Sequence, residues 1–223
     1  MTRTCLKERS LPLYTKGEEI FNYVTHIVGG AWGVFTLLAC LAVSIYEQNA
    51  VATVCGMIFG FSMIALYTVS SIYHALPRGT AKKVFQVLDH CTIYLLIAGT
   101  YTPMLMCGLM KTAPVAAWTT LVVVWGLAAL SITLNAIDLR KYKLFSMIGY
   151  VGMGWAIIFN IGSMYKALGA TGFALLLGGG ILYTLGLVFY KIGAHKRYYH
   201  SVFHIFVLLG SILHSLSVIF YTL

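Results

Sequence analysis

Three histidines, two of them at a spacing that suits metal binding, stand in the apolar C-terminal segment. Residues 198–215 read "YYHSVFHIFVLLGSILHS" and contain His200, His204 and His214. His200 and His204 are four residues apart, so a helix presents both imidazoles on one face, as a metal ion held by one helix requires. His74, at the end of another apolar segment, would supply a third ligand. Three imidazoles with an open fourth position are the catalytic form of a zinc site.

Asp89 and Ser70 are the candidates for the other catalytic roles. The segment reads H-S-V-F-H and not H-E-x-x-H, which disfavours a metalloprotease with a built-in glutamate base. Asp89 is the only acidic residue within an apolar segment, and beside Zn²⁺ it would stay ionised and accept a proton from bound water. A carboxylate at a helix start also suits the helix dipole or an N-cap, and that alternative stays open. Ser70, one turn before His74, would orient a ligand or donate to a developing oxyanion.

Three further polar residues are candidates for supporting the metal ligands from outside the coordination sphere. Asn22 and His26 begin the first apolar segment, where they either support the site or simply pack. His214 lies ten residues beyond His204, about 15 Å further along a helix, which is too far to bind the same ion. We therefore expect His214 to make a hydrogen bond between helices.

The composition places these residues in a membrane protein. Of the 223 residues, 60% are hydrophobic and only 9% are charged, whereas soluble domains are nearer one quarter charged. The net charge of +9 would suggest a nucleic-acid partner in a soluble protein. Here the basic residues fall in short gaps between apolar segments, where they act as topology signals, and we expect no nucleic-acid partner.

Seven apolar segments are long enough to cross a bilayer, which takes roughly 20 residues. They lie approximately at 22–45, 51–75, 86–109, 113–136, 144–165, 169–190 and 200–222. The sequence therefore predicts an all-α, polytopic membrane protein with a seven-transmembrane-helix bundle over 22–223, preceded by a short cytoplasmic N-terminal segment, 1–21. No cleavable signal peptide is expected, because the first apolar segment is itself long enough to span.

The basic residues predict the orientation of this bundle. One side would carry thirteen of them (Arg3, Lys7, Arg9, Lys16, Arg78, Lys82, Lys83, Arg140, Lys141, Lys143, Lys191, Lys196 and Arg197). The other side would carry only Lys111 and Lys166. The positive-inside rule then places the N-terminus in the cytoplasm and the C-terminus outside.

On this topology the candidate site residues fall at one depth near the cytoplasmic interface, although they are far apart in the sequence. Helical phase adds a second criterion. His200, His204, Ser211 and His214 lie within about 80° of one another on one helix face. Tyr67, Ser70 and His74 form a similar stripe on a second helix. Because lipid offers no hydrogen-bond partners, both stripes are predicted to face the interior of the bundle.

Four stretches, "EEIFNYVTH", "SSIYHALP", "LDHCTIYLLIAGTYTP" and "HSVFHIFVLLGSILH", together resemble the hemolysin III branch of the progestin and adipoQ receptor family. That family belongs to the CREST superfamily of membrane hydrolases, which includes alkaline ceramidases. The resemblance implies a seven-helix bundle with a cytoplasm-facing zinc site. It implies His74, His200 and His204 as the zinc ligands, Asp89 at the metal-bound water and Ser70 beside it.

This sequence differs from the family in two respects that bear on function. Ser201 stands where many hemolysin III members have a glutamate. The chain also lacks the long N-terminal region of the adiponectin receptors, which makes a ligand-receptor role less expected. The short single-domain form resembles bacterial members and implies a bacterial-type plasma (inner) membrane.

Three functions follow as hypotheses. The first is zinc-dependent, ceramidase-like hydrolysis of an amide or ester bond in a membrane lipid. The second is a non-enzymatic regulator of membrane homeostasis, or a haemolytic (cytolytic) membrane protein, with a structural zinc ion. The third, a haem ligand set or proton relay, is weaker, because two imidazoles at i, i+4 on one helix cannot bind one haem from opposite faces.

Overall fold

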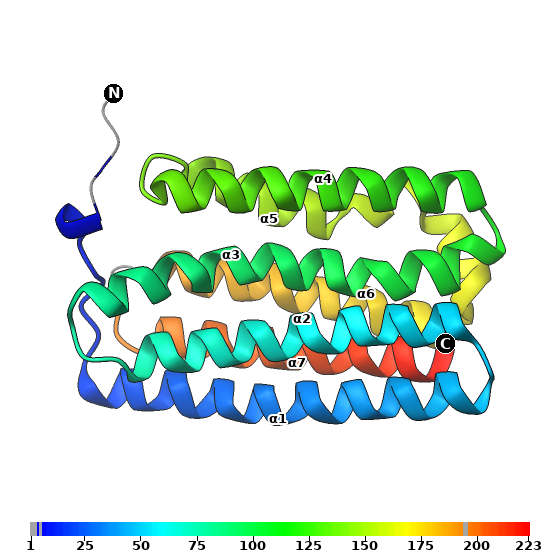
Figure 1. The fold of residues 1–223 in the computed structure, drawn as a ribbon, viewed down its shortest axis with the longest axis horizontal. Helices are drawn as coiled ribbons and strands as arrows, with labels where there is room; N and C mark the ends of the chain where they lie inside the picture. The colour runs from blue at the N-terminus through cyan, green and yellow to red at the C-terminus, as the bar shows by residue number, and fades with distance from the viewer. Residues whose placement is uncertain (1–3, 5, 194–195) are drawn as a thin grey trace.

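The structure is a computed structural model that describes residues 4, 6–193 and 196–223. Its main elements are α1 (Lys16–Tyr46), α2 (Ala50–Ala75), α3 (Thr80–Pro103), α4 (Pro114–Asp138), α5 (Lys143–Gly154), α6 (Ile161–Gly193) and α7 (Tyr199–Tyr221). Short turns of other helix types are η1 (Leu6–Glu8), η2 (Met104–Gly108), η3 (Leu109–Lys111) and η4 (Ala156–Asn160). The described residues contain helices and no strands, so the predicted all-α class is confirmed. The helices run side by side, with the two chain termini at opposite ends of the bundle (Figure 1).

Six helical stretches in the described chain are long and apolar enough to cross a membrane. They are Lys16–Tyr46, Ala50–Ala75, Thr80–Lys111, Pro114–Asp138, Lys143–Gly193 and Tyr199–Tyr221. The fifth stretch has 51 residues and contains α5, η4 and α6. The chain is therefore a multi-pass membrane protein by the length and composition of its helices.

The segments predicted at 144–165 and 169–190 differ from the observed elements. The helix expected over 144–165 ends at Gly154, and η4 and the start of α6 follow. Tyr101 stabilises this break, because its hydroxyl donates to the Gly154 carbonyl and accepts the Ile157 N–H, both at 3.0 Å. The break was not predicted, since the residue that satisfies it lies on α3. The predicted boundary before residue 169 coincides with a kink at Gly169, whose φ of 68° is readily adopted only by glycine.

The first helix begins six residues earlier than the predicted segment. Thr15 and Glu18 form a capping box, in which the Glu18 N–H donates to Thr15 Oγ1 and the Thr15 N–H donates to the Glu18 carboxylate. The same carboxylate accepts the N–H of Tyr198 at 2.7 Å. Because Tyr198 directly precedes α7, this bond fixes the start of α1 against the start of α7.

The bundle core is centred on α3, which is the most buried of the candidate spans. Phe59, Met63, Tyr94, Leu105 and Val124 are among its fully buried apolar side chains. Because α3 occupies the middle of the bundle, α1, α2 and α7 form one side of the molecule and α4 and α5 form another (Figure 1).

The polar stripes predicted on α2 and α7 face each other inside the bundle. The Tyr67 hydroxyl of α2 donates to Ser211 Oγ of α7 at 2.7 Å, and Tyr183 of α6 shares a 2.8 Å hydrogen bond with the same oxygen. Ser211 is fully buried. The expectation that these stripes point away from lipid is confirmed.

Candidate metal centre

Three imidazoles from two helices meet at one end of the bundle. His74 comes from the last turn of α2, and His200 and His204 come from the first two turns of α7. Each offers a ring nitrogen, and these three atoms lie within 4.8 Å of one another. The residues are only 2%, 8% and 2% exposed, respectively. The structure thus brings together the three histidines that the sequence indicated as metal ligands.

The geometry of the cluster fits a tetrahedral metal ion. The Nε2 atoms of His200 and His204 are 3.1 Å apart. Two nitrogens bound to one tetrahedral zinc ion at 2.0–2.1 Å would be about 3.3 Å apart. Nε2 of His74 is buried and has no hydrogen-bond partner among the described residues, which leaves its lone pair for a ligand. A set of three imidazole nitrogens suits zinc and other late transition metals.

A carboxylate from α1 fixes the tautomer of His74. Glu19 Oε2 lies 2.7 Å from His74 Nδ1, so Nδ1 carries the proton and donates a hydrogen bond to the carboxylate. In the neutral ring, Nε2 is then unprotonated and available for a metal ion. Carboxylate–histidine–metal arrangements of this kind raise the basicity of the ligating nitrogen and set the ring orientation.

Lys82 holds Glu19 in place. Its Nζ atom lies 2.8 Å from Glu19 Oε1 and also donates to the carbonyl oxygens of His74 and Leu76 at 3.2 and 2.9 Å. The ammonium group therefore uses all three of its N–H donors. It also lies at the C-terminal end of α2, where the helix dipole favours a cation. Lys82 is only 3% exposed, so its charge and that of Glu19 neutralise each other inside the protein.

Sequence reasoning missed Glu19 and Lys82. A signal was present for Glu19, because Glu19, Asn22 and His26 are spaced by three and four residues and share one face of α1. Extending the predicted first helix back to its capping box would have placed Glu19 on the face of the site. For Lys82 the sequence carries only its position in a basic loop.

Asn22 and His26 lie directly against the cluster. Asn22 Nδ2 is 3.4 Å from His74 Nδ1. The His26 ring stacks on His204 with 3.8 Å between ring centroids, and it lies nearly perpendicular to the Tyr67 ring with 5.0 Å between centroids. Both ring nitrogens of His26 are buried and have no partner within the described ranges. His26 is thus a buried polar group whose hydrogen-bonding capacity is unused in the protein.

Tyr14 covers the cluster from the N-terminal side. Its ring stacks on His200 at a centroid distance of 4.9 Å and lies 5.8 Å from His74. Burial raises the pKa of the Tyr14 phenol, and the neighbouring Tyr73 and Tyr190 phenols and the Glu19 and Asp89 carboxylates raise it further. The phenol therefore stays protonated throughout the physiological pH range.

The two proposed catalytic side chains lie on different helices. Ser70 is buried on α2, one turn before His74. Asp89 is half-buried on α3, within electrostatic range of Tyr14. The hydrogen bonds and ion pairs of the described residues do not join the Asp89 carboxylate to any histidine of the cluster.

His214 makes the type of contact that was expected for it. Its Nε2 atom lies 3.0 Å from the Leu176 carbonyl oxygen, which joins α7 to α6. Its ring contacts Tyr183 edge-on at 5.1 Å. His214 therefore bonds to a backbone carbonyl of α6 and not to a histidine of the cluster.

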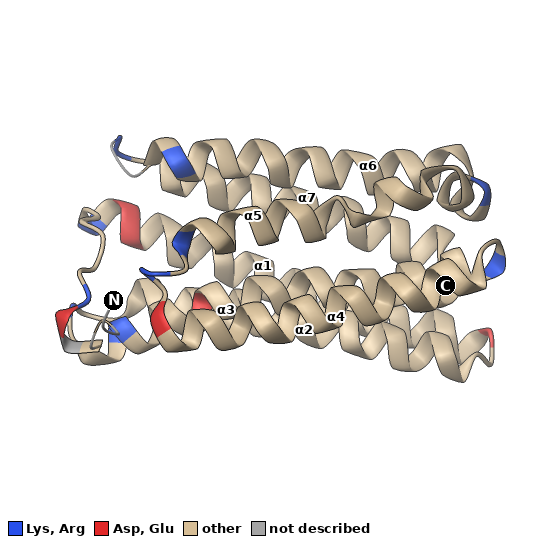
Figure 2. Cartoon of the chain, turned by 90° about the horizontal axis from the view of Figure 1, so that it is seen from above, with Lys and Arg blue, Asp and Glu red and all other residues tan. Residues whose placement is uncertain are grey.

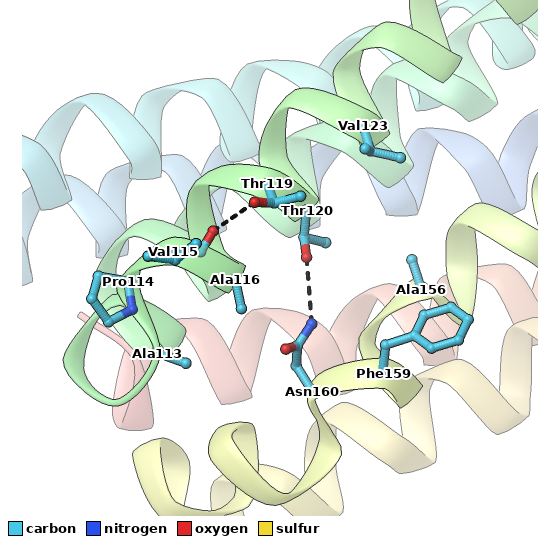
Figure 3. A pocket seen from close by; sticks show the side chains of 10 residues that line it. All are labelled: Ala113, Pro114, Val115, Ala116, Thr119, Thr120, Val123, Ala156, Phe159 and Asn160. Carbon is cyan, nitrogen blue, oxygen red and sulfur yellow. Dashed lines mark hydrogen bonds between the residues drawn. The ribbon is translucent and has the colours of Figure 1, made fainter.

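A pocket lies away from the cluster, between α4 and η4. It has a volume of about 720 Å³ and is lined mainly by apolar side chains such as Val115, Ala156 and Phe159 (Figure 3). Thr120 and Asn160 supply polar atoms and share a 3.4 Å hydrogen bond (Figure 3). Its lining contains no histidine, cysteine or carboxylate among the described residues, so the trihistidine cluster is the better candidate for chemistry.

A helical bundle of membrane-spanning segments with a buried trihistidine cluster defines a multi-pass membrane protein with a candidate metal centre. The family model described as "Haemolysin-III related" matches residues 14–215, and the chain belongs to this family. This confirms the resemblance to hemolysin III that the four sequence motifs indicated.

Similar proteins come from bacteria and animals. The chain is 38% identical over 206 residues to "Hemolysin-3" of Bacillus cereus, with 92% of each protein covered. It is 36% identical over 209 residues to "Hemolysin-3 homolog" of Bacillus subtilis (strain 168), covering 94% of this chain and 96% of that protein. It is 28% identical to the human "Monocyte to macrophage differentiation factor", over 87% of this chain and 77% of that protein.

Proposed function

We propose that this protein is a zinc-dependent hydrolase that acts on an amide or ester bond of a membrane lipid. The observation that carries the proposal is the buried cluster of His74, His200 and His204, with the His74 tautomer fixed by Glu19. A zinc ion held there would polarise a carbonyl group and lower the pKa of water.

The chain's own residues have distinct roles in this proposal. In their neutral form the three imidazoles offer unprotonated nitrogens, which is the form that binds a metal. Asp89 accepts the proton released by the attacking water and returns it to the amine or alcohol that leaves when the C–N or C–O bond breaks. Ser70 donates a hydrogen bond to the carbonyl oxygen of the substrate. Tyr14 excludes bulk water from the site, as its stacking on His200 suggests.

We also propose seven membrane crossings with the N-terminus in the cytoplasm. The 51-residue stretch Lys143–Gly193 would extend about 76 Å as one helix, more than twice the hydrocarbon thickness of about 30 Å. If this stretch crosses the membrane twice, with the turn near Gly169, each crossing has a length that fits the bilayer. Two crossings here also agree with termini at opposite ends of the bundle (Figure 1). Lys and Arg gather at the end that bears the N-terminus (Figure 2), which supports the cytoplasmic assignment of that end. The two Bacillus relatives support a bacterial-type plasma membrane as the location.

Turnover by the purified protein tests this function. The protein is reconstituted into vesicles with zinc and a panel of amide- and ester-linked lipids, and the products are measured by mass spectrometry. We expect Asp89→Ala to lower the rate about 100-fold or more while keeping the metal, because it removes a proton acceptor. Lys141→Ala, an exposed side chain, is the control and should keep full activity. Fully metallated wild-type protein that converts none of these lipids would contradict the proposal.

The alternative is a non-enzymatic membrane regulator or a haemolytic protein with a structural metal ion. The burial of all three imidazoles and the Tyr14 ring over His200 favour it, because structural metal sites are closed. The name "Hemolysin-3" describes the Bacillus cereus relative, and carrying it to this chain is part of this alternative. Lysis of erythrocytes by purified protein, together with unfolding of His200→Ala, would favour this alternative over catalysis.

A further inference from the structure

A second pocket of about 370 Å³ lies directly outside the metal centre. It is formed by the first two turns of α1, the end of α2, the loop that follows and the start of α3, and His74 is part of its wall. Three cationic side chains, Lys16, Arg78 and Lys82, line it together with one carboxylate, Glu19. The excess of positive charge makes the pocket attractive to an anion.

The three cations contribute differently. Lys82 uses its donors on Glu19 and two carbonyl oxygens, so its charge is already compensated. Arg78 has no carboxylate partner in the described chain. Two of its five N–H groups donate to the carbonyl oxygens of Pro12 and Leu11 at 3.0 and 3.3 Å, which fixes the guanidinium and leaves three donors. Lys16 is exposed and lines the same pocket. A planar guanidinium with free donors is well suited to phosphate.

An apolar surface begins at the edge of the same pocket. Ile20 and Ala75 line the pocket and are exposed on the outside of the bundle. Val24 and Ile27 continue this surface along α1, one and two turns further on, at 46% and 56% exposure. In a membrane this face lies against acyl chains, because α1 is a spanning helix at the side of the bundle (Figure 1).

We propose that the pocket binds the phosphate of an anionic membrane phospholipid, whose acyl chains lie along the Ile20–Val24–Ile27 face. A basic pocket joined to an apolar surface at the level of the membrane interface matches such a ligand in both charge and shape. The inference rests on the proposed function, whose lipid substrate it narrows to the anionic phospholipids. The phosphate would lie against Arg78 and Lys16, on the outer side of His74.

Equilibrium binding of short-chain lipids to the purified, metal-loaded protein tests the inference without requiring turnover. Dioctanoyl phosphatidylglycerol is compared with dioctanoyl phosphatidylcholine, which has the same chains and phosphate but no net charge, and with glycerol 3-phosphate, which has no chains. We expect phosphatidylglycerol to bind most tightly. Lys16→Gln and Arg78→Gln should each weaken its binding roughly fivefold, with a smaller effect at high salt. Lys141→Gln, which removes an exposed cation at the same end but outside the pocket, should leave binding unchanged.

Each other outcome overturns the inference. Equal binding of the two lipids, or unchanged binding in both pocket variants, would show that the pocket does not recognise the anionic headgroup. Glycerol 3-phosphate binding as tightly as phosphatidylglycerol would make a free phosphate the ligand instead of a lipid. The metal content of each variant shows whether the centre is intact, so a misfolded protein is recognised. Turnover of a lipid without phosphatidylglycerol binding would contradict only the proposed phospholipid site. Phosphatidylglycerol binding without turnover would contradict only the proposed hydrolase activity.

Discussion

At the scale of single residues, Glu19 decides which nitrogen of His74 faces the cluster. Its carboxylate accepts a hydrogen bond from His74 Nδ1 at 2.7 Å and forms an ion pair with Lys82 Nζ at 2.8 Å. Without a negative charge at this position, His74 would lose the partner that fixes its tautomer and ring orientation. The carboxylate also compensates Lys82, a buried cation that would otherwise be costly.

Glu19→Gln is expected to lower the metal affinity of the centre about 10- to 100-fold, as does the loss of comparable partners of metal-bound histidines. Competition with a chromogenic chelator measures the affinity. Glu47→Gln, at the opposite end of α1, is the matched control and should bind metal as the wild type does. Unchanged affinity in Glu19→Gln would show that the carboxylate does not act on His74.

Replacing any one of His74, His200 and His204 by alanine is expected to remove most of the bound metal, because two imidazoles hold an ion far more weakly than three. His214→Ala should retain it, since His214 bonds to the Leu176 carbonyl away from the cluster. Elemental analysis of purified protein gives the metal content per chain. Loss of metal in His214→Ala to the same extent would point to general destabilisation and not to ligation.

At the scale of elements, the contact between α1 and α2 positions the residues that surround the metal centre. The two helices approach so closely at Gly29 that a Cβ atom there would overlap the Tyr67 ring. Tyr67 in turn contacts His26 with its ring and Ser211 with its hydroxyl. A displacement at this contact would therefore reach α7, which bears two of the three histidines.

Gly29→Ala is expected to destabilise the bundle by about 1–3 kcal/mol, the usual cost of overpacking. Gly30→Ala provides a matched control one residue away, where the nearest Tyr67 atom would be 3.9 Å from the new Cβ, an ordinary contact. Because alanine favours a helix more than glycine does, Gly30→Ala should be neutral or stabilising. Thermal unfolding in detergent compares the two variants. Equal unfolding temperatures would mean that α1 and α2 do not pack as described.

At the scale of the whole molecule, the centre joins the first and last parts of the chain. α2 supplies one histidine, α7 supplies two, and Glu19 of α1 completes the arrangement. A metal ion bound there would link helices that are more than a hundred residues apart in the sequence, so binding is coupled to the stability of the bundle.

Removing the metal with a chelator is expected to lower the unfolding temperature of the wild-type protein. Free metal at about 100 times its dissociation constant would stabilise the folded state by about 2.7 kcal/mol. The triple variant His74→Ala, His200→Ala and His204→Ala should show no response to the chelator. Thermal unfolding with and without added zinc measures the difference, and an equal response in both proteins would contradict binding at the cluster.

The proposed double crossing of residues 143–193 makes a prediction about the two sides of the membrane. An impermeant thiol reagent should label Lys166→Cys in intact cells and Lys141→Cys only after the cells are permeabilised. Both variants are made with Cys5 replaced by serine. The other four native cysteines, at 40, 55, 91 and 107, are buried and should react little. Labelling of both positions from the same side would exclude a crossing between residues 141 and 166, and with it the double crossing of 143–193.

The sequence by itself determined the helical class, most of the helix positions and the residues of the trihistidine cluster. These features follow from local rules, because the length of an apolar segment sets its span and helical periodicity sets which side chains share a face. The equal depth of His74 and His200 on the predicted topology was enough to bring two distant segments to the same layer.

Only the tertiary structure showed which residues surround the histidines and satisfy the helix ends. Glu19 reaches His74, Tyr14 covers His200 and Tyr101 satisfies the break after α5, and each contact joins elements that are distant in the sequence. Local periodicity gives the face and depth of a side chain but not the neighbour that packs against it. Neighbours are set by the packing of whole helices, which is why the residues that orient the cluster emerged only from the folded bundle.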